Sequence, residues 1–180
     1  MRLPALVLAA AFVSASSPAF AGPLSALYVF GDSLSDNGNL TAIVDAAVPG
    51  PGPVVPAPPY APGRASNGPV AVEYLAQYLG LAPLLPAALG GTNYAVIGAA
   101  TGEVPFPIPG NPTNTADNIA EPLGLALPVA TGIRNAQLPL FLSSLTGPID
   151  PDALFVVWGG PNDVFINPTP ATVQVSVKKR

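Results

Sequence analysis

The stretch ALFVVW at residues 153–158 carries the clearest secondary-structure signal in the chain, and the turn GGPND at residues 159–163 follows it directly. Every residue of the stretch is apolar or aromatic, so a strand formed here has no face suited to water. Strands at the centre of a parallel sheet are buried on both faces in this way. The stretch therefore predicts a central parallel strand that ends in a glycine-rich and polar turn.

Two further apolar runs have the same form. SALYVF at residues 25–30 leads into the turn that begins with Gly31, and TNYAVI at residues 92–97 leads into the small residues GAA at 98–100. Short apolar runs that end in turn residues are typical of buried strands. The sequence thus predicts three strands, each followed by a turn.

The segments between these strands favour helices. NGP at residues 67–69 opens a helix that Gly80 closes, and residues 133–145 are amphipathic, with Pro139 expected to kink or split that helix. A shorter helix is expected at residues 41–47. Alternating strands and helices predict an α/β fold with a parallel sheet.

Two segments are predicted to be loops. Residues 49–63 hold seven prolines and three glycines, a composition that forms neither a helix nor a central strand. This segment could be a substrate-facing loop or a tolerated insertion, and the sequence favours neither. Residues 102–128 are rich in Pro, Asn and Thr and are predicted to form a second loop.

Composition narrows the function classes. Hydrophobic residues make up 49% of the 180 residues, charged residues only 9%, and the net charge is −4. Such a chain can bury a core. It has no basic footprint for nucleic acid. Cysteine is absent, so no disulfide or Cys-ligated metal is expected, and histidine is absent as well. A nucleotide site is disfavoured, because neither GxGxxG after the first strand nor a P-loop lysine is present.

Residues 1–21 have the pattern of a secretory signal peptide. Arg2 gives a basic start, the following apolar run is too short to span a membrane, and Ala19-Phe20-Ala21 fits a cleavage site. We expect export to the periplasm or the extracellular space, with residues 22–180 forming the N-terminal part of a single domain. No other segment is predicted to span a membrane.

Ser33 is the first candidate for chemistry. It follows the first predicted strand and lies in a turn between Gly31 and Asp36. Parallel sheets place their sites at the carboxyl ends of strands, and the other two ends carry Gly98 and Asn162. Taken alone, a serine in a turn usually has only a structural role. The neighbouring motifs strengthen the catalytic interpretation.

Four ordered segments resemble the GDSL/SGNH hydrolase family. VFGDSLSD at residues 29–36 resembles the first block of that family. GRASNG at 63–68, with VEYLA at 72–76, is similar to the segment that follows it. GTNYAVIGA at 91–99 and VWGGPND at 157–163 are similar to the second and third blocks.

The resemblance implies an α/β fold that is a three-layer αβα sandwich with a flavodoxin-like parallel sheet. It implies that Ser33 attacks a carboxylic ester, and that the backbone N–H groups of Ser33 and Gly98 and the side chain of Asn162 stabilise the oxyanion. Ile97 stands where many members have a first glycine. The expected substrates are small or medium acyl esters, lipids or glycan acetyl esters, and no cofactor is implied.

The family's base and its orienting acid come from a late Asp-x-x-His block, which residues 164–180 do not contain. We therefore expect the chain to be truncated before that block and to have little esterase activity alone. Asp32 and Asp36 are expected to have structural roles, and Arg64 could pair with a carboxylate of the motif turn or lie near the substrate. Two alternatives stay open, a non-catalytic secreted binding module and an inactive gene fragment.

Overall fold

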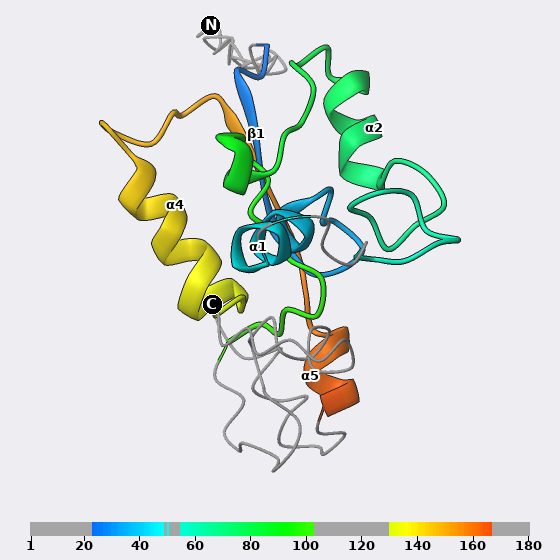
Figure 1. Ribbon diagram of the computed structural model, residues 1–180. Helices are drawn as coiled ribbons and strands as arrows, with labels where there is room; N and C mark the ends of the chain where they lie inside the picture. Colours follow the sequence, from blue (N-terminus) through cyan, green and yellow to red (C-terminus); the bar gives the residue numbers. More distant parts are fainter. Residues whose placement is uncertain (1–22, 49, 51–54, 103–129, 167–180) are drawn as a thin grey trace, which may run out of the picture.

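The computed structural model describes residues 23–48, 50, 55–102 and 130–166 (Figure 1). The expected signal peptide and nearly all of the second predicted loop lie outside these residues. The described elements, in chain order, are β1 (Ala26–Gly31), α1 (Asn39–Ala47), α2 (Ala71–Tyr78), the 3-10 turn η1 (Ala87–Leu89), the π-helix η3 (Ile133–Gln137), α4 (Leu138–Ser144), β2 (Ala153–Trp158) and α5 (Pro161–Ile166).

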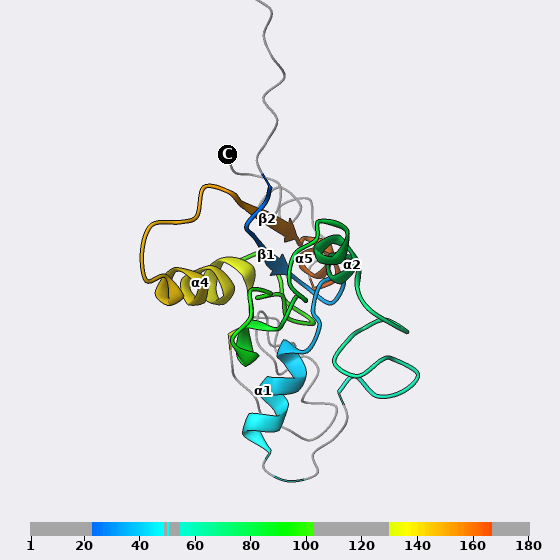
Figure 2. The ribbon, with the colours of Figure 1, turned by 90° about the horizontal axis from the view of Figure 1, so that it is seen from above.

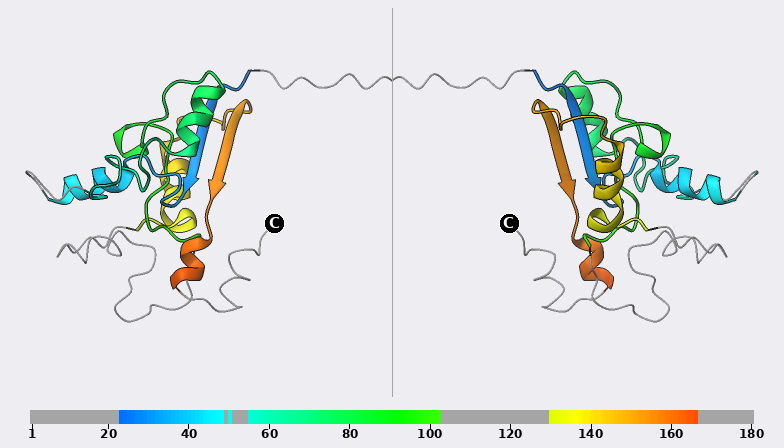
Figure 3. Two further views of the ribbon diagram at one scale, coloured as in Figure 1. Left: turned by 90° about the vertical axis from the view of Figure 1, so that its right-hand side faces the viewer. Right: turned by 90° about the vertical axis from the view of Figure 1, so that its left-hand side faces the viewer.

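Two of the three predicted strands form a parallel pair. β1 and β2 are in register from Ala26 opposite Ala153 to Gly31 opposite Trp158. The two strands run side by side in the same direction, and α5 continues from the end of β2 (Figure 3). The prediction of a parallel sheet is therefore confirmed for these segments.

The prediction of a regular strand at residues 92–97 is wrong. Only an isolated parallel bridge joins Asn93 to Val29, although Val29 N–H donates to Thr92 O at 3.1 Å and Tyr94 N–H donates to Val29 O at 2.7 Å. Asn93 also bridges to Pro86 on its other side. The segment lies along the free edge of β1, and Val96 N–H donates to Gly31 O at 3.0 Å. Gly31 N–H donates to the side chain of Gln137 instead of to this segment, so the ladder does not extend further.

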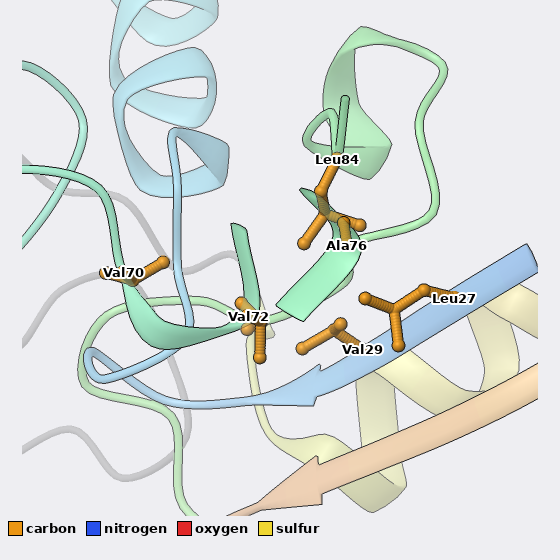
Figure 4. Close-up of a cluster of buried hydrophobic side chains, with 7 residues drawn as sticks. Leu27, Val29, Val70, Val72, Ala76 and Leu84 are labelled. Carbon is orange, nitrogen blue, oxygen red and sulfur yellow. The ribbon is translucent and has the colours of Figure 1, made fainter. Parts of the chain in front are cut away.

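The strand pair separates two layers of helix. In the view from above, α4 lies to one side of β1 and β2 and α2 lies to the other (Figure 2). Successive side chains of a strand point to opposite faces. Leu27 and Val29 of β1 accordingly pack against Val72 and Ala76 of α2 (Figure 4). A strand pair between two helical layers is the arrangement of the three-layer αβα sandwich that the sequence predicted.

Aromatic residues fill the opposite face. Phe30 and Tyr94 stack with ring centroids 5.3 Å apart, and Phe141 of α4 meets both edge-on, at 5.5 and 5.8 Å. Tyr28 stacks on Phe155 of β2 at 5.2 Å. Offset-stacked and edge-to-face pairs of this kind add to the stabilisation from burial alone. They hold α4 against both strands.

The predicted helices are largely confirmed. α1 and α2 lie where the sequence places them, and Gly80 follows α2 with φ = 69°, a left-handed conformation that suits glycine. The expected interruption of the helix at 133–145 is also present. Pro139 lies in the first turn of α4, and the preceding turn is the π-helix η3. A proline lacks the backbone N–H that a continuous helix would use, so its place at a helix start is favourable.

Candidate active site

Ser33 lies in a single helical turn directly after β1. The N–H groups of Ser35 and Asp36 both donate to the carbonyl oxygen of Asp32, at 3.1 and 3.0 Å, and Leu34 N–H donates to Asp32 Oδ1 at 3.0 Å. Asp32 thus closes the turn with its backbone and its side chain. Ser33 is half-buried and lines a pocket, and its own N–H donates no hydrogen bond within the described residues.

Gly98 lies in a tight turn at the end of residues 92–97, the segment beside β1. Ala99 N–H donates to Val96 O at 3.1 Å, and Gly98 has φ = 83°. Positive φ at the third position of a turn requires glycine in most cases. Ile97 N–H donates to Asp36 Oδ2 at 2.9 Å, which ties this turn to the turn of Ser33. Gly98 N–H donates no hydrogen bond within the described residues.

Asn162 lies in the first turn of α5, directly after β2. Its Nδ2 donates to the carbonyl oxygen of Ala99 at 2.8 Å, so the third predicted site residue contacts the turn that contains the second. Asp163 reinforces the junction, because its Oδ1 accepts from Thr101 Oγ1 at 2.7 Å and its Oδ2 accepts from Thr101 N–H at 3.0 Å. The structure therefore brings together the three turns that carry Ser33, Gly98 and Asn162.

Asp32 has an unusual electrostatic position beneath this junction. It is 1% exposed, and its Oδ2 has no hydrogen-bond partner within the described residues. Burial raises the pKa of this carboxyl above its ordinary value, and the nearby carboxylate of Asp163 raises the pKa further. Two buried carboxyl groups thus lie close enough to repel each other, and one of them directly precedes Ser33 in the sequence.

Comparison with known proteins identifies the family. The model of the GDSL-like lipase/acylhydrolase family matches residues 27–179. The chain belongs to this family. It is 33% identical over 123 residues to a GDSL esterase/lipase of Arabidopsis thaliana, an overlap of 59% of this chain and 30% of the relative. A second GDSL esterase/lipase from the same plant is 35% identical over 101 residues, which are 52% of this chain and 25% of that relative. The chain therefore spans less than a third of either of these relatives.

The polar residues of the GDSL block serve mainly as internal ties. Asp36 is fully buried and accepts four backbone hydrogen bonds, from Gly38 and Asn39 on Oδ1 and from Leu40 and Ile97 on Oδ2, at 2.7 to 3.2 Å. Burial raises the pKa of Asp36. The four N–H groups oppose that rise, because hydrogen bonds that they donate stabilise the charged carboxylate. The expected structural roles of Asp32 and Asp36 are both confirmed.

Three buried asparagines extend this network between the first and second GDSL blocks. Asn93 Nδ2 donates to Ser35 O at 2.7 Å and to Asn37 Oδ1 at 2.8 Å. Asn39 Nδ2 donates to Asn93 O at 2.7 Å and to Ala95 O at 2.8 Å. Buried amides whose groups are paired rigidify a fold, because each lost partner exposes an unsatisfied group. The network fixes the position of the turn containing Ser33.

Gln137 is a residue that sequence reasoning missed. Its side chain is buried, and its Oε1 accepts from Gly31 N–H at 2.8 Å while its Nε2 donates to Gly31 O and to Thr131 O, both at 2.8 Å. Gly31 is the last residue of β1 and lies two residues before Ser33. A Cβ at Gly31 would lie 2.5 Å from the carbonyl oxygen of Trp158, so the position requires glycine. Gln137 thus accepts the Gly31 N–H that a longer ladder with residues 92–97 would use, while Val96 N–H still donates to Gly31 O at 3.0 Å.

Arg64 pairs with a carboxylate outside the motif turn, contrary to the first of the two expectations. Its guanidinium pairs bidentately with Glu73 of α2, with Nε donating to Oε2 at 2.7 Å, and Val70 N–H donates to the same oxygen at 2.8 Å. Burial raises the pKa of Glu73, but the hydrogen bonds from Arg64 and Val70 outweigh it and leave the pKa lowered. The pair fastens the loop that precedes α2 to the start of that helix.

The described residues contain no cluster of metal ligands. In residues 23–48, 50, 55–102 and 130–166, no group of three or more Asp, Glu, His or Cys side chains is arranged to hold a metal ion. Over the same part of the chain, no helix combines the length and the apolar character needed to cross a bilayer.

Proposed function

We propose that this chain supplies the nucleophile and the oxyanion donors of a serine hydrolase that acts on carboxylic esters. The observation that carries the proposal is the hydrogen bond from Asn162 to Ala99, because it joins the turn after β2 to the turn of Gly98. Membership of the GDSL-like lipase/acylhydrolase family supports the same chemistry.

In the proposed reaction, the Oγ of Ser33 adds to the carbonyl carbon and the carbonyl oxygen becomes an oxyanion. The N–H groups of Ser33 and Gly98 and the second hydrogen of Asn162 Nδ2 would donate to that oxygen. The carbon–oxygen bond to the alcohol then breaks, the alcohol leaves with the proton from the Ser33 hydroxyl, and the acyl group stays on Oγ until water removes it. Fixed donors stabilise charge that develops only in the transition state.

The proposed site lacks a general base for the Ser33 hydroxyl. The sequence contains no histidine, which is the usual acceptor of the serine proton. Without a base, both the attack of Ser33 and the later attack of water are slow. We therefore expect the 180-residue chain to react once with an activated ester and to keep the acyl group rather than to turn over.

This expectation defines the experiment. The chain is incubated with p-nitrophenyl butyrate and digested, and the acylated peptide is identified by mass spectrometry. We expect butyrylation of Ser33 that is lost in Ser33→Ala, is retained in Ser66→Ala, and is slower by roughly 10²–10³-fold in Asn162→Ala. Ser66 is a matched control because it lines the same pocket as Ser33. Acylation spread evenly over exposed serines and lysines would contradict the proposed site.

A second function is favoured by the same lack of histidine. The scaffold could bind an ester or glycan without cleaving it. Binding of this kind would be unaffected by Ser33→Ala and would leave no acyl group on the protein. The acylation experiment therefore separates the two functions.

A further inference from the structure

A pocket of about 620 Å³ opens beside Ser33 on the face of the sheet that α2 covers. The turn after β1 contributes Leu34, the start of α2 contributes Val70, Val72 and Leu75, and the end of β2 contributes Val156 and Trp158. Because alternate residues of a strand share a face, Val156 and Trp158 both point to this side. The pocket thus connects the predicted nucleophile with the apolar layer between the sheet and α2.

The lining defines the ligand chemistry. Among the residues that the structure describes, no charged side chain lines the pocket, and the polar side chains that do so are Ser33, Ser35 and Ser66. A ligand that fits is a hydrocarbon chain with a polar group at the Ser33 end. An acetyl group would leave most of the volume empty, whereas pockets of roughly 300–1,000 Å³ bind ligands of many atoms.

We propose that this pocket binds the acyl chain of the substrate, and that the chain selects esters of medium-length straight-chain fatty acids over acetyl esters. The inference rests on the proposed function, because the acyl carbonyl must lie at Ser33. Binding can nevertheless be measured without hydrolysis, so the two proposals can fail independently.

Neutral methyl ketones from butanone to decanone are suitable probes, because they keep the acyl chain and the carbonyl but have no bond to hydrolyse. Trp158 is the only tryptophan of the chain and lines the pocket, with 53% of its surface exposed. Its fluorescence should shift to the blue as a chain fills the pocket. Each added methylene should tighten binding roughly fourfold, until the pocket is full.

Two matched pairs of variants locate the binding site. Ala71→Leu narrows the pocket at an exposed helical position, and Ala46→Leu makes the same change beside a separate pocket of about 600 Å³ along α1. Leu34→Ser likewise removes an exposed leucine from the pocket beside Ser33, and Leu89→Ser removes one from the pocket along α1. We expect Ala71→Leu and Leu34→Ser to weaken decanone binding roughly three- to tenfold, and the α1-side variants to leave it unchanged.

Several results would overturn the proposal. Affinity that does not depend on chain length, equal losses in both members of a pair, or no binding to the unmodified chain would each exclude an acyl site here. A blue shift that follows protein concentration without ketone would mean that a second copy covers this face instead. Far-UV circular dichroism verifies that each variant is folded.

Discussion

Replacing Asp36 with asparagine tests how far the GDSL turn depends on one buried carboxylate. Each oxygen of Asp36 accepts two backbone N–H groups, those of Gly38 and Asn39 on Oδ1 and those of Leu40 and Ile97 on Oδ2. An asparagine amide has one accepting oxygen and one donating nitrogen. Whichever way the amide turns, its NH₂ group faces two N–H donors that have lost their acceptor.

The cost follows from this count. A buried donor that is left unsatisfied costs about 1–3 kcal/mol, so two of them predict a loss of roughly 2–6 kcal/mol in the free energy of unfolding. Native domains are stable by only about 5–15 kcal/mol. Asp36→Asn is therefore expected to remove a large share of the stability of this chain.

Asp32→Asn is the matched control, four residues earlier in the same turn. Asp32 Oδ1 accepts from Leu34 N–H and an amide oxygen can do the same, while Oδ2 has no partner to lose within the described residues. The substitution also removes the repulsion between Asp32 and Asp163 that contributes to the raised pKa of Asp32. Its effect on stability is expected to stay within about 1 kcal/mol at neutral pH, in the range of substitutions that break no buried interaction.

The assay is urea unfolding, followed by Trp158 fluorescence and by far-UV circular dichroism. Coincident transitions and an unchanged m-value allow the midpoints to be converted into free energies. The reasoning is refuted if Asp36→Asn costs no more than Asp32→Asn. In that case the four short contacts of Asp36 would contribute nothing beyond what water provides in the unfolded chain.

Two further predictions concern stability. Because the pKa of Glu73 is lowered in the folded chain, its ion pair with Arg64 stabilises the fold above the unfolded value of 4.5, and this contribution is lost as the pH falls through the lower folded value. Glu73→Gln should lower the free energy of unfolding by about 1 kcal/mol at pH 7, because the ion pair is partly exposed. Its urea midpoints should converge with those of the unmodified chain as the pH falls. A difference in midpoint that stays constant with pH would contradict a stabilising role of the Glu73 carboxylate. Gln137→Leu leaves Gly31 N–H without its acceptor and should cost about 1–3 kcal/mol, with faster amide exchange at Gly31 by NMR. Gln77→Leu, at an exposed position of α2, should change neither quantity.

The elements with a strong apolar pattern could be predicted from the sequence. β2 has six apolar residues in a row, and β1 differs by one residue at each end from its predicted bounds. Residues 92–97 have a comparable pattern and lie beside β1, but the side chain of Gln137 takes the N–H of Gly31 that a longer ladder would use. This competing contact is a tertiary property that a local pattern does not contain.

The candidate site was predictable only in part, and for a similar reason. Ser33, Gly98 and Asn162 stand directly after predicted strands, so topology alone brings them to one edge of a parallel sheet. Gln137 lies 106 residues from Gly31 and reads as an ordinary helical residue, so no local signal marks it. The ion-pair partner of Arg64 could not be predicted either, since a long cationic side chain can reach several carboxylates.

The hydrogen bonds also explain why Ser33 is the residue of its turn that suits chemistry. Asp36, Asn37 and Asn39 are buried, and each uses its side chain to hold backbone groups of other segments. Ser35 is buried as well, and its carbonyl is tied to Asn93. A half-buried hydroxyl on a turn that is held this firmly has little freedom to lose when it reacts. The polar residues of the motif are therefore best understood as the support that fixes the hydroxyl of Ser33, the proposed nucleophile, beside an apolar pocket.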